Sequence, residues 1–269
     1  MLVVNTENIK NSSQYYWLYD KIRDVKEKLM TKVVRIDKSH LVINIIDLTS
    51  KTVIMILPGG GYTLLSNRES APVGTKFNMF GYNTAILYYT CESYTPYIEG
   101  KKALKELSKT FDDIIVVGFS AGGHLAGLLG TTNNHYNLKG MVLCYPVITL
   151  LNPLTHEETA QKLLGNDLSI ENRQKYSIDY RVNKHTVPTF IWTTKEDELV
   201  PYENSLLLVD ALNKHKIYHE FVLFPHGRHG LALADETAIV NNDMSFYSIE
   251  VSTWIDKAND FIKKILKRG

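Results

Sequence analysis

The stretch Gly-Phe-Ser-Ala-Gly at residues 118–122, directly after the apolar run Ile-Ile-Val-Val at 114–117, is the feature that most constrains this chain. A β-branched run of this kind predicts a buried strand, and the residues at 124–129 are typical of a helix. A strand that enters a helix through Gly-x-Ser-x-Gly is typical of a nucleophile elbow, which pushes the serine hydroxyl clear of the sheet. A plain glycine-containing turn is the alternative. The elbow interpretation makes Ser120 a nucleophile, which needs a base and an acid from other segments.

The rest of the chain has the rhythm of an α/β fold. The continuous apolar run at 52–57 predicts a strand buried on both faces, and after it strands and helices alternate. We expect further strands at 84–89, 114–117, 140–145, 189–193 and 220–224, and helices at 69–80, 97–109, from 122, at 202–213 and one ending at 267. Runs at 32–36 and 41–48 predict edge strands, and 15–30 predicts an amphipathic helix. These patterns indicate a mainly parallel central sheet with helices on both faces.

Residues 149–186 interrupt the alternation of strands and helices. Polar and charged residues dominate there, and only two short helical patches stand out, at 157–164 and 170–176. An insertion after the carboxyl end of a strand in an open α/β sheet lies where ligands bind, so we expect a small cap. A surface excursion unrelated to substrate is the alternative. Since no repeat, low-complexity tract or long linker divides the sequence, we expect residues 1–269 to form one domain.

The balance of charges argues against polyanionic partners. With 30 basic and 29 acidic residues the net charge is +1, so no field favours nucleic acid or an anionic membrane. Cations at a helix C-terminus explain the basic end at 263–268 more simply than a nucleic-acid patch does. The chain shows neither a signal-peptide pattern at its start nor a run of about 18 apolar residues, which predicts a cytoplasmic protein away from membranes. Cys91 and Cys144 lie in or beside apolar runs and are expected to be free thiols.

A glycine-rich loop follows the buried strand at 52–57. Residues 58–62 read Pro-Gly-Gly-Gly-Tyr, and three glycines let the backbone curl with its N–H groups unobstructed. A loop in this place shares an oxyanion hole with the residue after the nucleophile, so we expect oxyanion donors in the amides of Gly60, Gly61 and Ala121. A phosphate-binding loop is the alternative, but neither Gly-Lys-Ser/Thr nor a spaced Gly-x-Gly-x-x-Gly follows.

The acid is expected in the loop after the strand at 189–193. Residues 194–201 read Thr-Lys-Glu-Asp-Glu-Leu-Val-Pro and offer three consecutive carboxylates. Asp197 is favoured because neighbouring amides can fix its shorter side chain on a tight turn, whereas Glu196 and Glu198 are expected to be solvated.

The base is expected in the loop after the last strand, where residues 225–230 read Pro-His-Gly-Arg-His-Gly. Spacing does not separate His226 from His229. With either histidine, the chain order of nucleophile, acid and base matches that of α/β-hydrolases. The pair also matches a fragment of a metal site, but no further ligands cluster with it, so we expect no metal. His124, just after the elbow, is expected to be structural.

Together these motifs resemble the α/β-hydrolase superfamily and, within it, the acetylesterase-like branch that includes xylan and other carbohydrate acetylesterases. The resemblance runs from about residue 53 to 234 and rests on the segments 57–62, 118–126, 144–147, 197–205 and 224–231. The family pattern Gly-x-His-Gly implies that His229 is the base, and Asp-x-x-Val-Pro implies that Asp197 is the acid. Pro58 departs from the pattern, because many relatives have the histidine of His-Gly-Gly-Gly there, and it argues against the hormone-sensitive-lipase branch. Residues 1–40 match no family that we can name.

The resemblance implies a serine-dependent carboxylesterase that cleaves short-chain esters, acetyl esters above all, through an acyl-enzyme. Its substrate would be a small-molecule ester, with acetylated oligosaccharides as one class, and the reaction requires no cofactor. A prolyl-oligopeptidase-like peptidase, which shares the elbow and the order of acid and base, is one alternative. A catalytically inactive hydrolase fold that serves as a binding protein is another, and the intact Ser120, Asp197 and His229 argue against it. The sequence leaves the oligomeric state open.

Overall fold

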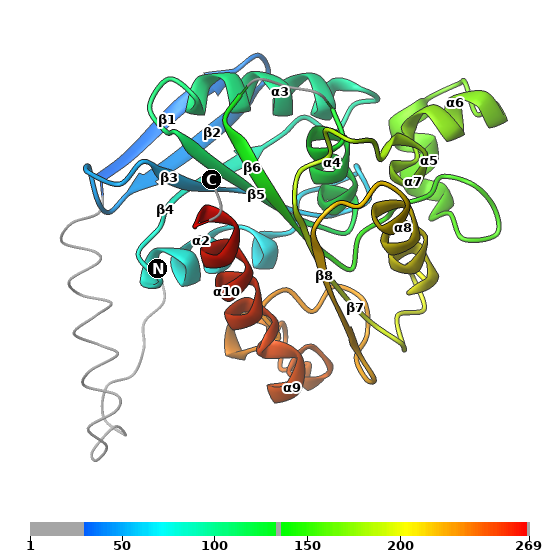
Figure 1. Cartoon of the computed structure of the whole chain (residues 1–269). Helices are drawn as coiled ribbons and strands as arrows, with labels where there is room; N and C mark the ends of the chain where they lie inside the picture. Colours follow the sequence, from blue (N-terminus) through cyan, green and yellow to red (C-terminus); the bar gives the residue numbers. More distant parts are fainter. Residues whose placement is uncertain (1–29, 133–135, 268–269) are drawn as a thin grey trace.

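The computed structural model describes residues 30–132 and 136–267, and an eight-stranded sheet forms its centre (Figure 1). The strands are β1 (Met30–Ile36), β2 (Ser39–Ile45), β3 (Thr52–Leu57), β4 (Asn83–Tyr88), β5 (Asp113–Phe119), β6 (Leu138–Cys144), β7 (Thr189–Thr194) and β8 (His219–Phe224). Their spatial order is β1-β2-β4-β3-β5-β6-β7-β8. The pairs β1–β2 and β2–β4 are antiparallel, and all strands from β3 to β8 run parallel.

The central strands are mostly apolar because both faces of the sheet are covered. In β3, Val53 and Met55 belong to one apolar cluster, Ile54 and Ile56 belong to the other, and none of the four has exposed area. Successive side chains of a strand point to opposite faces, so a strand buried on both sides places apolar residues on both.

The helices divide between the two faces of the sheet. α3 (Thr95–Leu107), α4 (Ala121–Gly130) and α8 (Glu203–Lys214) cover one face, and α2 (Ala71–Met79) and α10 (Trp254–Leu266) cover the other (Figure 1). The short turns η2 (Asn67–Glu69), η3 (Glu236–Ala238), η4 (Met244–Phe246) and α9 (Ile249–Ser252) lie in connections. The predicted mainly parallel sheet with helices on both faces is confirmed. Among the described residues, no helix is long and apolar enough to cross a membrane.

One prediction about the sheet is wrong, and another lies outside the described residues. The run at 41–48 does not form an edge strand, because β2 lies between β1 and β4 and pairs with both. Its alternate residues Leu41 and Ile43 are buried in the core, as an interior strand requires. The helix expected at 15–30 lies outside the described residues, except that Met30 begins β1.

The segment between β6 and β7 contains three short helices, α5 (Glu157–Leu164), α6 (Ile170–Tyr176) and α7 (Ile178–Arg181). α5 and α6 have the expected bounds, whereas α7 is too short to leave a periodic pattern in the sequence. α7 packs against α4 and α8, and a Cβ on Gly127 would come within 2.9 Å of the Ile178 side chain. That residues 149–186 form a cap, and that the whole chain is one domain, stay predictions. Both cysteines are free thiols.

Candidate active site

Ser120 lies in a sharp turn between β5 and α4, with φ 52° and ψ −116°. A left-handed backbone is strained for a residue that carries a Cβ. Close contacts require the flanking glycines: a Cβ on Gly118 would lie 2.2 Å from the Gly122 carbonyl oxygen, and one on Gly122 would lie 2.1 Å from that of Leu57. The spacing Gly-x-Ser-x-Gly is therefore a steric requirement of this turn.

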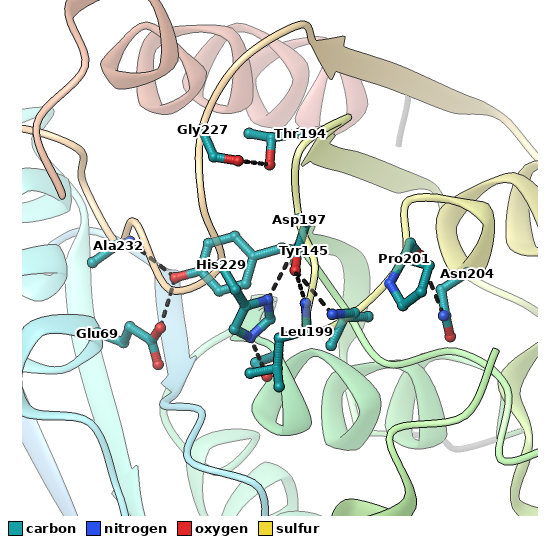
Figure 2. Close-up of polar contacts among 12 residues, drawn as sticks. Glu69, Tyr145, Thr194, Asp197, Leu199, Pro201, Asn204, Gly227, His229 and Ala232 are labelled. Carbon is teal, nitrogen blue, oxygen red and sulfur yellow. Dashed lines mark hydrogen bonds and ion pairs between the residues drawn. The ribbon is translucent and has the colours of Figure 1, made fainter. Parts of the chain in front are cut away.

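The imidazole of His229 stands between Ser120 and Asp197. Its Nε2 lies 2.8 Å from Ser120 Oγ, and its Nδ1 lies 2.7 Å from Asp197 Oδ2. His229 comes from the loop after β8 and Asp197 from the loop after β7, and the two side chains converge in Figure 2. The Asp197 side chain has no exposed area, and that of His229 is 13% exposed. The structure thus brings together the three residues that the sequence motifs select.

The turn that carries Asp197 also fixes its carboxylate. Oδ1 accepts from the N–H of Leu199 at 3.1 Å and from that of Val200 at 2.9 Å, which leaves Oδ2 for His229. An ionised carboxylate only accepts hydrogen bonds, so neutral His229 carries its proton on Nδ1 and its Nε2 accepts from the Ser120 hydroxyl. This tautomer can take the serine proton.

The other titratable groups of these two loops face solvent. Glu196 and Glu198 are exposed, and His226 Nδ1 lies 2.8 Å from Glu196 Oε1, away from Ser120. This contact raises the pKa of His226 and lowers the pKa of Glu196. The geometry therefore separates the two histidines that spacing leaves open. Within residues 30–132 and 136–267, no group of three or more histidine, cysteine or carboxylate side chains is arranged to hold a metal ion.

The glycine loop after β3 faces Ser120. Gly60 and Gly61 have positive φ, 129° and 63°, and with Ser120 and His229 they line a cavity of about 620 Å³. Neither glycine N–H donates to an acceptor within the described part of the chain. Ala121 is the first residue of α4, where a backbone N–H has no partner inside the helix. Three amides at the serine are therefore available to a ligand oxygen.

Two buried residues that the sequence reasoning missed, Glu69 and Tyr145, lie beside this constellation. The Tyr145 hydroxyl donates to Glu69 Oε1 at 2.6 Å and accepts from the Ala232 N–H at 2.9 Å (Figure 2). The Tyr145 ring meets that of His229 edge-on, with centroids 4.9 Å apart. Glu69 Oε2 accepts from the Gly59 N–H at 2.8 Å. The segment at 144–147 carries part of the family resemblance and could have drawn attention to Tyr145, but Glu69 has no comparable signal.

His124 is buried behind the glycine loop and holds it to other segments. Its Nδ1 lies 2.9 Å from the Tyr62 hydroxyl, and its Nε2 lies 2.8 Å from the Tyr176 carbonyl oxygen. Burial lowers the pKa of His124 to about 4, although the hydrogen bond to Tyr176 opposes this shift. Both ring nitrogens of His124 are thus bonded to groups other than Ser120, in keeping with the structural role expected of it.

A second cavity, of about 920 Å³, adjoins the first on the side of His229. We call it the His229-side cavity, and its walls are Arg68, Glu196, Glu198, Leu199, Arg228, His229, Gly230 and Phe246. The guanidinium groups of Arg68 and Arg228 lie over the Phe246 ring, at 3.9 Å and 4.2 Å from its centroid. Arg68 also donates to the Gly230 carbonyl at 3.0 Å. Stacking of this kind holds guanidinium groups in fixed positions beside His229.

Comparison with known proteins relates this chain to esterases and xylan-degrading proteins. It is 30% identical over 223 residues to endo-1,4-beta-xylanase B of Butyrivibrio fibrisolvens, covering 73% of this chain and 35% of that protein. It is 26% identical over 213 residues to an acetylxylan esterase of Xylanibacter ruminicola, covering 72% of this chain and 44% of that protein. The chain thus spans less than half the length of these curated relatives.

Solved structures share the same architecture. The crystal structure of the acetyl ester-xyloside bifunctional hydrolase from Caldicellulosiruptor lactoaceticus matches with a TM-score of 0.75 at 33% identity, covering 84% of this chain and 88% of that one. This similarity confirms the α/β-hydrolase fold. A sequence model described as the prolyl oligopeptidase family matches residues 53–249. Since this match spans most of the sequence, including the elbow and the loops after β7 and β8, the chain belongs to the prolyl oligopeptidase family.

Proposed function

We propose that this chain is a serine-dependent carboxylesterase that cleaves short-chain esters through an acyl-enzyme. The observation that carries the proposal is the position of His229, with Nε2 2.8 Å from Ser120 Oγ and Nδ1 2.7 Å from Asp197 Oδ2. Ser120 Oγ attacks the ester carbonyl as His229 takes its proton, and Asp197 stabilises the imidazolium that forms. His229 then protonates the leaving alcohol and activates the water that releases the acid.

The oxyanion of each tetrahedral intermediate is assigned to the amides of Gly60, Gly61 and Ala121. Their lack of other acceptors within the described residues supports this role. Loss of a single donor of this kind costs roughly 3–4 kcal/mol of transition-state stabilisation. Loss of one of these donors should therefore slow the reaction by roughly 10²-fold to 10³-fold.

The alcohol portion of the substrate is assigned to the His229-side cavity. His229 Nε2 must return its proton to the leaving oxygen, so the alcohol lies on that side of Ser120. The cavity walls carry two arginines and two glutamates, which together offer donors and acceptors with no net charge. A neutral alcohol with several hydroxyl groups satisfies both kinds of group. This supports a sugar as the alcohol, and the names of the acetylxylan esterase and the acetyl ester-xyloside hydrolase favour acetyl as the acyl group.

The segment 149–186 is proposed to act as a cap over this site. His156 and Glu158 of this segment line the same cavity as Ser120, and the Glu158 carboxylate accepts from the Thr63 hydroxyl at 3.1 Å. The segment thus closes the cavity on the side of the glycine loop.

Cleavage of peptides is a second candidate, because the family to which the chain belongs is named after a peptidase, prolyl oligopeptidase. The two activities share nucleophile, base and oxyanion donors and differ in the leaving group. Faster cleavage of an aminoacyl-nitroanilide than of an acetyl ester would favour the peptidase.

The proposal is tested with nitrophenyl esters of increasing acyl length, acetylated xylo-oligosaccharides and an aminoacyl-nitroanilide. Each substrate is given to the wild type, to Ser120→Ala and to a control, Ser108→Ala, at the C-cap of α3. We expect acetyl esters to be preferred and Ser120→Ala to lower kcat by roughly 10⁴-fold or more. Full activity of Ser120→Ala would refute the mechanism, and a preference for long acyl chains would refute the acetyl assignment. A folded wild type that turns over none of these substrates would favour the binding protein.

A further inference from the structure

The carboxylate of Glu69 is buried and has no cationic partner in the described part of the chain. The residue is 3% exposed, and no lysine, arginine or histidine nitrogen within the described residues lies within 4.0 Å of its oxygens. Removing a charge from water without an opposite charge beside it is unfavourable. A buried carboxylate is therefore retained where the hydrogen bonds that it accepts offset this penalty. We propose that Glu69 is a positioning residue that fixes the oxyanion loop and the catalytic base in place relative to Ser120. This proposal rests on the proposed esterase function.

The first contact of Glu69 fixes the glycine loop against the nucleophile. Its Oε2 accepts from the Gly59 N–H at 2.8 Å. Gly59 is wedged in place, since a Cβ on it would lie 2.7 Å from the Phe119 carbonyl oxygen and 3.0 Å from Ser120 Cβ. The next two residues of the loop are the proposed oxyanion donors. A shift of Gly59 therefore displaces both donor amides relative to Ser120 Oγ.

The second contact reaches the base through Tyr145. Glu69 Oε1 accepts from the Tyr145 hydroxyl at 2.6 Å, and that hydroxyl in turn accepts from the Ala232 N–H at 2.9 Å (Figure 2). Ala232 follows His229 by three residues, so this bond anchors the loop that carries the base. The Tyr145 ring packs edge-on against the imidazole of His229. One carboxylate thus orients both the loop of His229 and the surface on which its ring rests.

A carboxylate fits this position better than an amide does. Both partners of Glu69, the Gly59 N–H and the Tyr145 O–H, are donors, and a carboxylate offers an acceptor to each. A glutamine offers one acceptor and one NH₂ group, so one of the two donors loses its partner. Hydrogen bonds to charged groups are also the stronger ones. The isosteric substitution Glu69→Gln therefore loosens one side of the site without a change of volume.

The experiment compares Glu69→Gln and Tyr145→Phe with a matched control, Glu99→Gln. Glu99 is also a fully buried carboxylate with two donors, the N–H and hydroxyl of Thr90 at 2.7 Å and 2.8 Å, but it lines neither cavity at Ser120. For each variant one measures kcat and KM with 4-nitrophenyl acetate, the rate of inactivation by diethyl 4-nitrophenyl phosphate, and thermal unfolding. The phosphate reports on the nucleophile and the oxyanion donors without a turnover.

We expect Glu69→Gln to lower kcat and the inactivation rate together, by about 10-fold to 100-fold, with KM within about threefold of the wild type. Tyr145→Phe removes only the hydroxyl and is expected to lower both by about 3-fold to 10-fold. Glu99→Gln is expected to lower the melting temperature while kcat stays within about twofold of the wild type.

Two outcomes would overturn the proposal: a folded Glu69→Gln with wild-type kcat, or an equal loss of kcat in Glu99→Gln, which would mean a general effect of buried carboxylates. If Glu69→Gln does not fold, Tyr145→Phe decides, and wild-type kcat and inactivation rate in that variant would overturn the proposal. Failure of the esterase function itself is distinct, because it appears as absent turnover by the wild type or full activity of Ser120→Ala.

Discussion

Protonation of His124 should lower the free energy of unfolding of this protein in mild acid, because the ring is buried in its neutral form with both nitrogens hydrogen-bonded. A carbonyl oxygen can only accept, so His124 Nε2 carries the proton that is donated to Tyr176 O at 2.8 Å. Nδ1 is then the acceptor for the Tyr62 hydroxyl at 2.9 Å. A second proton on the ring would point at that hydroxyl and force it to accept instead. It would also place a charge where the residue has no exposed area.

The size of the effect follows from the pKa of His124, which burial lowers from 6.5 to about 4. Below about pH 6.5 the unfolded chain binds a proton that the folded state does not, so the free energy of unfolding falls as the pH falls. The loss levels off below about pH 4, where the folded state is protonated as well. Between about pH 7.5 and pH 5 this single group removes about 2 kcal/mol from the free energy of unfolding, because stability falls by about 1.4 kcal/mol for each pH unit between the two pKa values.

The assay is urea unfolding of the wild type and His124→Gln at several pH values in that window, with His215→Gln as an exposed-histidine control. Glutamine keeps a donor for the Tyr176 carbonyl but leaves the Tyr62 hydroxyl without its acceptor, which costs about 1–3 kcal/mol at neutral pH. It cannot titrate, so its loss of stability towards pH 5 should be smaller than that of the wild type by about 2 kcal/mol. Parallel curves for the two proteins would refute a neutral His124 in the folded state.

Two further predictions concern the site itself. Asp197→Asn should lower kcat by about 10⁴-fold, because the new NH₂ group donates to His229 Nδ1 and so selects the wrong tautomer of the ring. The free energy of unfolding should change little, since Oδ1 still accepts from the Leu199 and Val200 amides. Wild-type kcat would contradict the assignment of the acid. Gly60→Ala should abolish turnover, since its Cβ would lie 2.1 Å from the Leu64 carbonyl oxygen. A Cβ on Gly61 meets nothing nearer than 3.7 Å among the described residues, so Gly61→Ala should only lower stability, by about 1–2 kcal/mol, because of the positive φ at this position. Equal kcat values in the two alanine variants would contradict this loop conformation.

Local rules recover most of the fold from the sequence. The run at 52–57 coincides with β3, and the patches at 157–164 and 170–176 coincide with α5 and α6. These segments are predictable because burial on both faces or an amphipathic face determines their residue types directly. The position of β2 is different. Whether a strand has one neighbour or two depends on where β1 folds back, and no residue of β2 by itself encodes that.

The candidate site divides in the same way. Ser120, Asp197 and His229 are predictable because each stands in a motif whose spacing a tight turn imposes. Glu69 and Tyr145 carry no such constraint, since their roles arise from contacts between segments 76 residues apart in the chain. Such contacts become visible only when the sheet order is known.

The order of the strands explains why Tyr145 packs against the ring of His229. The glycine loop, Ser120, Asp197 and His229 follow β3, β5, β7 and β8, and β6 lies between the strands of nucleophile and acid. Register aligns Phe119 with Cys144, so the residue after β6 lies directly beside the elbow, and Ser120 N–H donates to the Cys144 carbonyl at 3.0 Å. His229 comes from β8 and must cross β7 and β6 to reach Ser120. Tyr145, which follows Cys144, therefore lies where the His229 loop passes over the sheet. Its large ring packs against the imidazole, and the hydroxyl at the end of the ring donates to Glu69.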